Sequence, residues 1–262
     1  MAKARPQTKK KEQPVAKPPA SFYHTKDYLL HFPGLSEFPG KISFPKPFTF
    51  GDYKRWIRAV FKETADKEEE ETAADVFFRE YQGALEVVAR WELKGISKEE
   101  AVPENEELPM EIASFLTAAA ETYIGPKIIV QTTTQTMLRR MNDAHTSPEF
   151  ETADMLHMMP DLATYPGKFG FARQLTARLY RAWDKGMAVK DEFDPRDVEN
   201  SVLARQYRAA LPLISSWEVK GVERSELTES GDGVPMVIVS WLADCADAYL
   251  GYRTNQKKLV MR

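Results

Sequence analysis

Apolar residues at helical spacing define the first predicted helix. Four of them fall at positions i, i+3, i+4 and i+7, namely Tyr53, Trp56, Ile57 and Val60. This spacing places them on one face of a helix packed against a core. Thr49 is placed to cap the amino end of this helix, and Asp52 can complete a capping box with it.

Two further helices are predicted downstream. The second runs from about Ala73 to Lys94 and ends before Gly95, with apolar residues at helical spacing throughout: Phe77, Tyr81, Leu85, Val88 and Trp91. The third starts near Pro109, because proline is favoured in a first turn, and finishes before Gly125. Ahead of all three, Pro39-Gly40-Lys41 followed by alternating apolar residues predicts a short β-hairpin.

The chain also resembles itself. Residues 25–56 realign without gaps onto 152–183 with 12 identities in 32 positions, and 81–125 onto 207–251 with 16 in 45. Because the offset changes only from 127 to 126, the pattern predicts duplication of a unit of roughly 100 residues.

The second copy repeats the local signals of the first. Pro166-Gly167-Lys168 repeats the hairpin signal, Thr176 the cap, and Gly221 the end of the second helix. Pro212 lies inside that helical pattern, where we expect a kink or a break. The predicted fold class is mainly α, a tandem duplication of a unit of three helices preceded by a short β-hairpin.

This pattern gives five predicted segments. They are a disordered tail at 1–20, helical repeat 1 at 21–125, a connector at 126–151 with a helical middle, helical repeat 2 at 152–251 and a C-terminal tail at 252–262. The first segment carries six Lys or Arg against one Glu, with four Pro, a composition that does not offset its own ordering entropy.

Charge and cysteine content narrow the class of protein. The net charge of −3 argues against a body that binds nucleic acid, and subtracting the tail's +5 leaves about −8, densest at Asp66 and Glu68 to Glu71. Two interpretations of the basic tail stay open, contact with nucleic acid and a solubility role. The single cysteine excludes an intramolecular disulfide, and the chain lacks a signal peptide or a long apolar stretch, so we expect a cytoplasmic protein with no membrane partner.

No catalytic, metal or cofactor chemistry is predicted. The segment GLSEFPGK at 34–41 has the wrong spacing for a phosphate-binding loop. The four histidines have no metal-ligand spacing: His24, His31, His145 and His157. Cys245 lies among apolar neighbours, so we interpret it as a small buried side chain. We expect no enzyme and no cofactor.

The tryptophans pair between the copies, Trp56 with Trp183 and Trp91 with Trp217. Stacking platforms for a ligand are one interpretation, and core packing is the simpler one, because truncating a buried Trp costs about 3–5 kcal/mol.

Together these motifs resemble the tail assembly chaperones of long-tailed bacteriophages. The resemblance rests on FPGKISFPKPFTFGDYKRW and RWELKGI in one copy and on YPGKFGFARQLTARLYRAW and SWEVKGV in the other, and it spans most of 25–251. It implies a non-enzymatic protein of the host cytoplasm that binds the helical tape measure protein and helps to load tail-tube subunits. The tandem copies and the basic leader depart from the family pattern.

A helical client would lie in grooves lined by aromatic residues and methionine. The candidate partner-binding residues are Tyr53, Met110, Phe115, Tyr180, Met236 and Trp241. The alternative is a structural virion subunit, associated with the tail or capsid, in which the paired repeats pack into a ring or tube; oligomer size and copy number in particles separate the two.

Overall fold

The computed structural model describes residues 22–61, 72–128, 148–188, 197, 199 and 201–260. Three predictions fall outside the described residues: the disordered tail at 1–20, the acidic stretch at 66–71 and the helical middle of the connector.

The prediction of a mainly α fold, a duplicated unit of three helices behind a hairpin, is wrong. The described chain is mixed α and β, because its helices are accompanied by two antiparallel sheets of three strands each. Helix α2 (Ala73–Glu86) stops short of Lys94, and the expected last turn is strand β3 (Arg90–Leu93). Trp91 lies at helical spacing from Val88 and also alternates with Leu93, so the sequence is compatible with both periods.

The first sheet has the order β1-β2-β3, with β1 at Phe22–His24 and β2 at Gly40–Ser43. The expected hairpin at 39–44 is therefore one central strand, whose Ile42 pairs with Tyr23 on one side and Trp91 on the other. A Cβ at Gly40 would lie 2.0 Å from the carbonyl oxygen of Glu92, so the close approach of β2 and β3 requires glycine there.

The second sheet has the same order, formed by β4 (Glu149–Glu151), β5 (Gly167–Phe171) and β6 (Ile214–Val219). The register also matches, since Phe169 pairs with Trp217 as Ile42 pairs with Trp91. In both sheets the third-strand tryptophan donates its indole N–H to a carbonyl five residues on, Trp91 to Ile96 at 2.9 Å and Trp217 to Val222 at 2.7 Å.

The remaining helices begin where the sequence signals place them, but the expected end before Gly125 is wrong, because the third helix continues to Ile128. In the first half the other helices are the 3-10 helices η1 (Thr25–Tyr28) and η2 (Pro33–Glu37) and the α-helices α1 (Phe50–Val60) and α3 (Met110–Ile128). In the second half the α-helices are α5 (Thr152–Met155), α6 (Ala177–Met187), α7 (Val202–Ala210) and α8 (Met236–Val260). Its 3-10 helices are η3 (Pro160–Thr164), η5 (Leu211–Leu213) and η6 (Arg224–Glu226). The capping box of Thr49 and Asp52 is confirmed. The break at Pro212 is confirmed as well, because α7 ends at Ala210 and Pro212 lies in η5.

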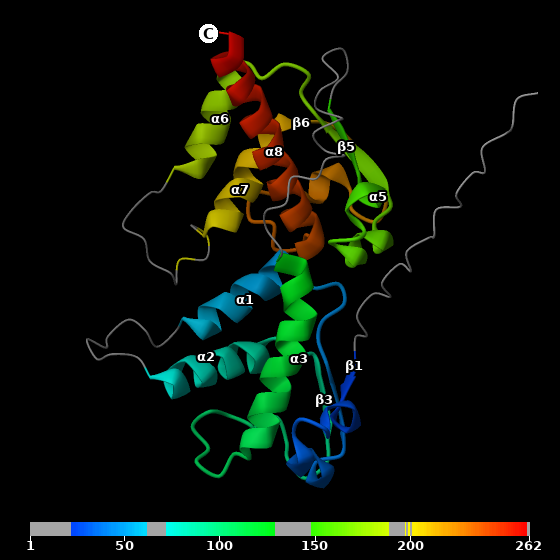
Figure 1. Ribbon diagram of the computed structural model, residues 1–262, viewed down its shortest axis with the longest axis vertical. Helices are drawn as coiled ribbons and strands as arrows, with labels where there is room; N and C mark the ends of the chain where they lie inside the picture. Colours follow the sequence, from blue (N-terminus) through cyan, green and yellow to red (C-terminus); the bar gives the residue numbers. More distant parts are fainter. Residues whose placement is uncertain are drawn as a thin grey trace, which may run out of the picture.

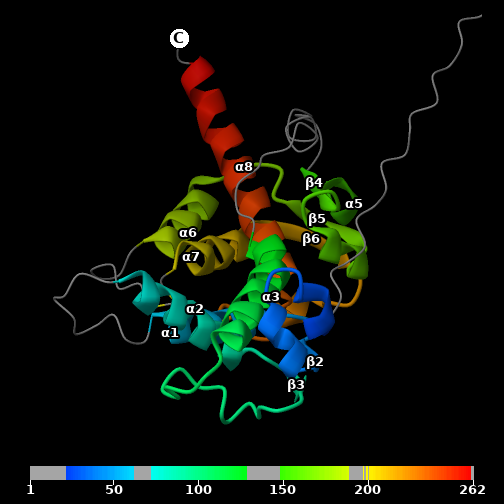
Figure 2. The same cartoon turned by 60° about the horizontal axis from the view of Figure 1, so that its bottom comes forward.

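In each half the long helix lies between a pair of helices and a sheet (Figures 1 and 2). Helix α3 lies between α1–α2 and the first sheet, and α8 lies between α6–α7 and the second. Aromatic contacts join sheet to helix: Phe44 stacks on Tyr123 at 5.0 Å, and Phe169 meets Trp241 edge-on at 4.6 Å. The paired tryptophans of the sequence pack against this core, in agreement with the packing interpretation.

The halves meet at the carboxyl end of α3 and the amino end of α8 (Figure 1). Helix α1 is on the side of the first half that faces the second, whereas α6 is on the side of the second half away from the first. Helix α8 continues to Val260, through most of the segment expected as a C-terminal tail. Within the ranges described, no helix has the length and apolar character needed to cross a membrane.

Candidate functional site at the junction between the halves

Backbone pairing joins the segment before α1 to the segment before α8. Three N–H groups donate across it: Met236 to the carbonyl of Phe48 at 2.7 Å, Phe50 to that of Val234 at 2.8 Å and Gly51 to that of Asp232 at 3.1 Å. Thr49 and Pro235 form an antiparallel bridge between these bonds. The first N–H groups of a helix have no acceptor within the helix. In α1 these groups bind carbonyls of the second half, which fixes the first turn of α1 against it.

Two glycines allow this close contact. A Cβ at Gly51 would lie 2.8 Å from the carbonyl oxygen of Asp232. Gly231 has φ +64°, and a Cβ there would lie 2.8 Å from Cε1 of Tyr207. The ring of Phe50 lies beside Gly231, with its Cδ1 3.0 Å from the position of that Cβ and its centroid 5.9 Å from that of Tyr207.

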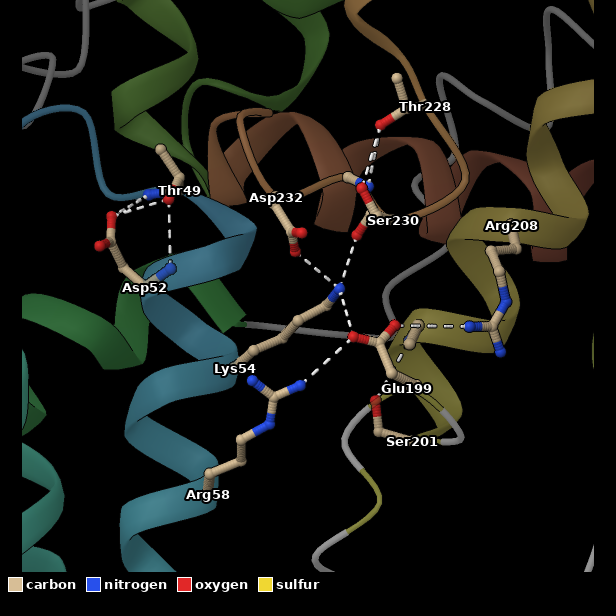
Figure 3. Close-up of polar contacts among 12 residues, drawn as sticks. Thr49, Asp52, Lys54, Arg58, Glu199, Ser201, Arg208, Thr228, Ser230 and Asp232 are labelled. Atoms are coloured by element: carbon tan, nitrogen blue, oxygen red, sulfur yellow. Dashed lines mark hydrogen bonds and ion pairs between the residues drawn. The ribbon is translucent and has the colours of Figure 1, made fainter.

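Lys54 of α1 is a buried charge at the junction (Figure 3). Its side chain is 2% exposed, and its ammonium nitrogen lies 2.8 Å from Oδ1 of Asp232, 2.7 Å from Oε1 of Glu199 and 2.7 Å from the carbonyl oxygen of Ser230. An ammonium has three N–H donors, so all three are satisfied. Such complete pairing is what makes a buried charge tolerable.

Glu199 connects this cluster to two arginines (Figure 3). Arg58 lies 3.5 Å from its carboxylate and Arg208 lies 3.7 Å away. Glu199 is 44% exposed, so water screens these pairs, and each is expected to contribute little to stability. Their effect is to hold Glu199 beside Lys54.

A second buried lysine lies on the other side of the junction. Lys127, in the last turn of α3, has its ammonium 3.0 Å from Oδ2 of Asp161 and 3.7 Å from the ring centroid of Tyr123. Burial lowers the pKa of Lys127, and the Asp161 carboxylate partly opposes this shift. Ser240 of α8 donates its hydroxyl to the Lys127 carbonyl at 2.7 Å.

Lys127 and Asp161 border a cavity of about 120 Å³ between the halves. Pockets that bind small molecules are usually about 300–1,000 Å³, so this cavity is below that size. Its volume is enough for a few water molecules. The geometry of the junction is therefore that of a protein–protein contact within one chain.

The candidate partner-binding residues divide by exposure. Four of the six are buried and contact neighbours within the chain: Tyr53 at 8% exposed, and Phe115, Met236 and Trp241 at 0%. The other two are exposed, Met110 at 48% and Tyr180 at 45%. Only Met110 and Tyr180 present their side chains to a partner, and the structure does not bring them together, since they lie at opposite ends of the molecule, at the start of α3 and on α6.

The cysteine and the histidines were the other candidates for chemistry. Cys245 is buried, and burial raises the pKa of its thiol, which keeps it protonated. Across the described ranges, no group of three or more His, Cys, Asp or Glu is placed to hold a metal ion. His145 lies outside those ranges.

Sequence reasoning missed Lys54, Lys127 and the exposed Leu30. For Lys54 a signal was available, because Arg181 occupies the aligned position and both copies therefore carry a base there. For Leu30 the signal was the aligned His157, which shows that this position is not held apolar by a core. Lys127 gave no signal, since its partner Asp161 aligns with Gly34.

No protein-family model matches the sequence, and neither a characterised protein nor a solved structure matches it.

Proposed function

We propose that this chain is a non-enzymatic assembly protein of the tail assembly chaperone type. It binds a long helical client, such as a tape measure protein, in the host cytoplasm and keeps the client's apolar surface covered until tail-tube subunits assemble. Its partners are proteins, and its folded body binds neither nucleic acid nor membrane.

The observation that carries the proposal is the exposure of Leu30. This side chain is 89% exposed and the adjacent Leu29 is 36% exposed. The turn that presents them is ordered by hydrogen bonds from the N–H groups of His31 (3.0 Å) and Phe32 (2.9 Å) to the Tyr28 carbonyl. Contiguous exposed apolar side chains mark protein-binding surfaces, and Leu29 and Leu30 are adjacent on an ordered element. The apolar face of an amphipathic helix has the complementary chemistry.

Co-purification from the native cells tests the proposal. The tagged full-length chain should recover a long helical protein, identified by mass spectrometry, and Leu30→Asp should lose it. The matched control is His157→Asp, which places the same charge at the aligned, exposed position of the other half. Recovery of no helical protein would refute the chaperone proposal, and equal recovery by all three chains would refute the role of Leu30 in client binding.

A structural virion subunit is the second candidate, and the junction favours it. One half binds the other through unlike surfaces, a mode of contact that can propagate into rings or tubes. Counting copies in purified particles separates the candidates, because a chaperone is absent from the finished particle and a structural subunit is present at fixed stoichiometry.

A further inference from the structure

We propose that a second copy of this chain binds head to tail, with the α6 end of one copy seated on the start of α3 in the next. The contact between copies would use the surfaces equivalent to those that α1 and the start of α8 use within the chain. This inference does not rest on the chaperone proposal, because it concerns the purified protein alone.

The junction uses the α1 surface of the first half and the α8 surface of the second half. The equivalent surfaces, on α6 and at the start of α3, are left unused. Within the chain, the segment before α1 in the first half meets the start of α8 in the second half. The counterpart of α1 is α6, which faces away from the first half, and the counterpart of the start of α8 is the start of α3, at the opposite end of the molecule (Figure 1). A contact between unlike surfaces does not close on itself in a pair, so both ends remain available.

Exposure identifies these surfaces residue by residue. Tyr53 in α1 is 8% exposed, whereas the aligned Tyr180 in α6 is 45% exposed. Met236 at the start of α8 is 0% exposed, whereas the aligned Met110 at the start of α3 is 48% exposed. At each pair, the residue at the junction is covered and its counterpart at the free end is uncovered.

Charge complementarity is kept at the two free ends. The ion pair at the junction joins Lys54 to Asp232. The aligned residues are Arg181 and Glu106, which carry the same signs and are both exposed. In a head-to-tail pair, Arg181 of one copy would face Glu106 of the next, which fixes the register of the contact.

Two differences make the contact between copies weaker than the one within the chain. Arg178 is aligned with Gly51, where a Cβ would lie 2.8 Å from a backbone oxygen, so the free ends cannot approach as closely as the junction does. Ala177 is aligned with Phe50 and supplies less apolar surface. Association between copies is therefore expected to depend on protein concentration.

End-blocked variants of the full chain test the proposal by sedimentation velocity. The wild-type protein should sediment faster as its concentration rises, and Met110→Asp and Tyr180→Asp should each stay monomeric. An equimolar mixture of the two variants should form dimers and nothing larger, because each variant keeps the end that the other lacks. Both substitutions are at exposed positions, and unchanged thermal melting would confirm that the variants fold.

Leu30→Asp is the matched control. His157, at the aligned position, is exposed although the junction is formed, so Leu30 lies outside the proposed contact and the variant should associate as wild type does. Wild-type protein that stays monomeric at every concentration would overturn the proposal, as would blocked variants that still associate or a mixture without dimers. Because no client is present, failure here is distinct from failure of the chaperone proposal.

Discussion

Lys54 and Asp232 are 178 residues apart in the sequence and form an ion pair of 2.8 Å across the junction. The two partners are solvated very differently, since the lysine side chain is 2% exposed and the aspartate side chain is 63% exposed. The stability of the pair therefore depends on the lysine, which has exchanged water for protein acceptors.

Asp232→Ala should lower the free energy of unfolding by about 1–3 kcal/mol, because one of the three N–H groups of a buried ammonium loses its acceptor. Urea unfolding of the two proteins measures the difference. Glu229→Ala removes an exposed carboxylate from the same loop and should have little effect. Equal losses for the two variants would show that net charge, and not the pairing of Lys54, sets the stability.

Gly51→Ala should destabilise the protein although alanine is the better helix former. A Cβ at Gly51 would lie 2.8 Å from the carbonyl oxygen of Asp232, and overpacking of this kind typically costs about 1–3 kcal/mol. Gly233→Ala is the control, since no atom lies within 4 Å of a Cβ there and the change restricts only the unfolded chain. Thermal unfolding should give a lower midpoint for the first variant and an equal or higher one for the second.

Local signals predicted the amino-terminal cap of α1 and the break in the second half, but neither the sheets nor the helix ends expected at glycine. Thr49, Asp52 and Pro212 act through neighbours in sequence, so their roles could be read directly. The strand at Arg90–Leu93 could not, because a strand is defined by its partners and β2 lies about fifty residues earlier. Trp91 also fits the helical spacing, so its alternation with Leu93 did not indicate a strand.

Less of the junction could be predicted from the sequence, because its contacts join residues that are far apart in the chain. Tyr53 and Tyr180 are aligned and chemically identical, yet only the neighbouring half decides that one is covered and the other exposed. Lys54 is a charged residue on a helix, for which exposure is the usual expectation. Its burial depends on Glu199, Ser230 and Asp232, which are brought together only by the junction.

Asp247→Asn should change the pH dependence of stability. Burial raises the pKa of Asp247 above its ordinary value of 3.8, and the hydrogen bond donated by Gln206 partly offsets this. Between 3.8 and the raised pKa the folded state binds more protons than the unfolded state, so the free energy of unfolding falls as pH rises through that window. Above that pH window the loss of unfolding free energy stays constant.

The asparagine variant has no such titration and keeps an acceptor for Gln206. Relative to wild type it should gain stability as pH rises through the window, which urea unfolding at a series of pH values would measure. Asp184→Asn, an exposed position on α6, is the control and should follow wild type. A difference between Asp247→Asn and wild type that does not vary with pH would contradict the assignment.

Ser240→Ala should weaken the contact between α3 and α8. Ser240 is 0% exposed, and its hydroxyl donates to the Lys127 carbonyl at 2.7 Å. That carbonyl is in the last turn of α3, where carbonyls have no partner within the helix, so its loss leaves a buried acceptor unsatisfied.

The expected cost is about 1–3 kcal/mol of unfolding free energy. Ser36→Ala, which removes an exposed hydroxyl from η2, should stay within about 0.5 kcal/mol of wild type. If Ser240→Ala unfolds at the same urea concentration as Ser36→Ala, the bond to Lys127 does not hold the two long helices together. The junction would then depend on the Lys127–Asp161 ion pair and on the α1 side, through Lys54 and the backbone pairing that precedes α1.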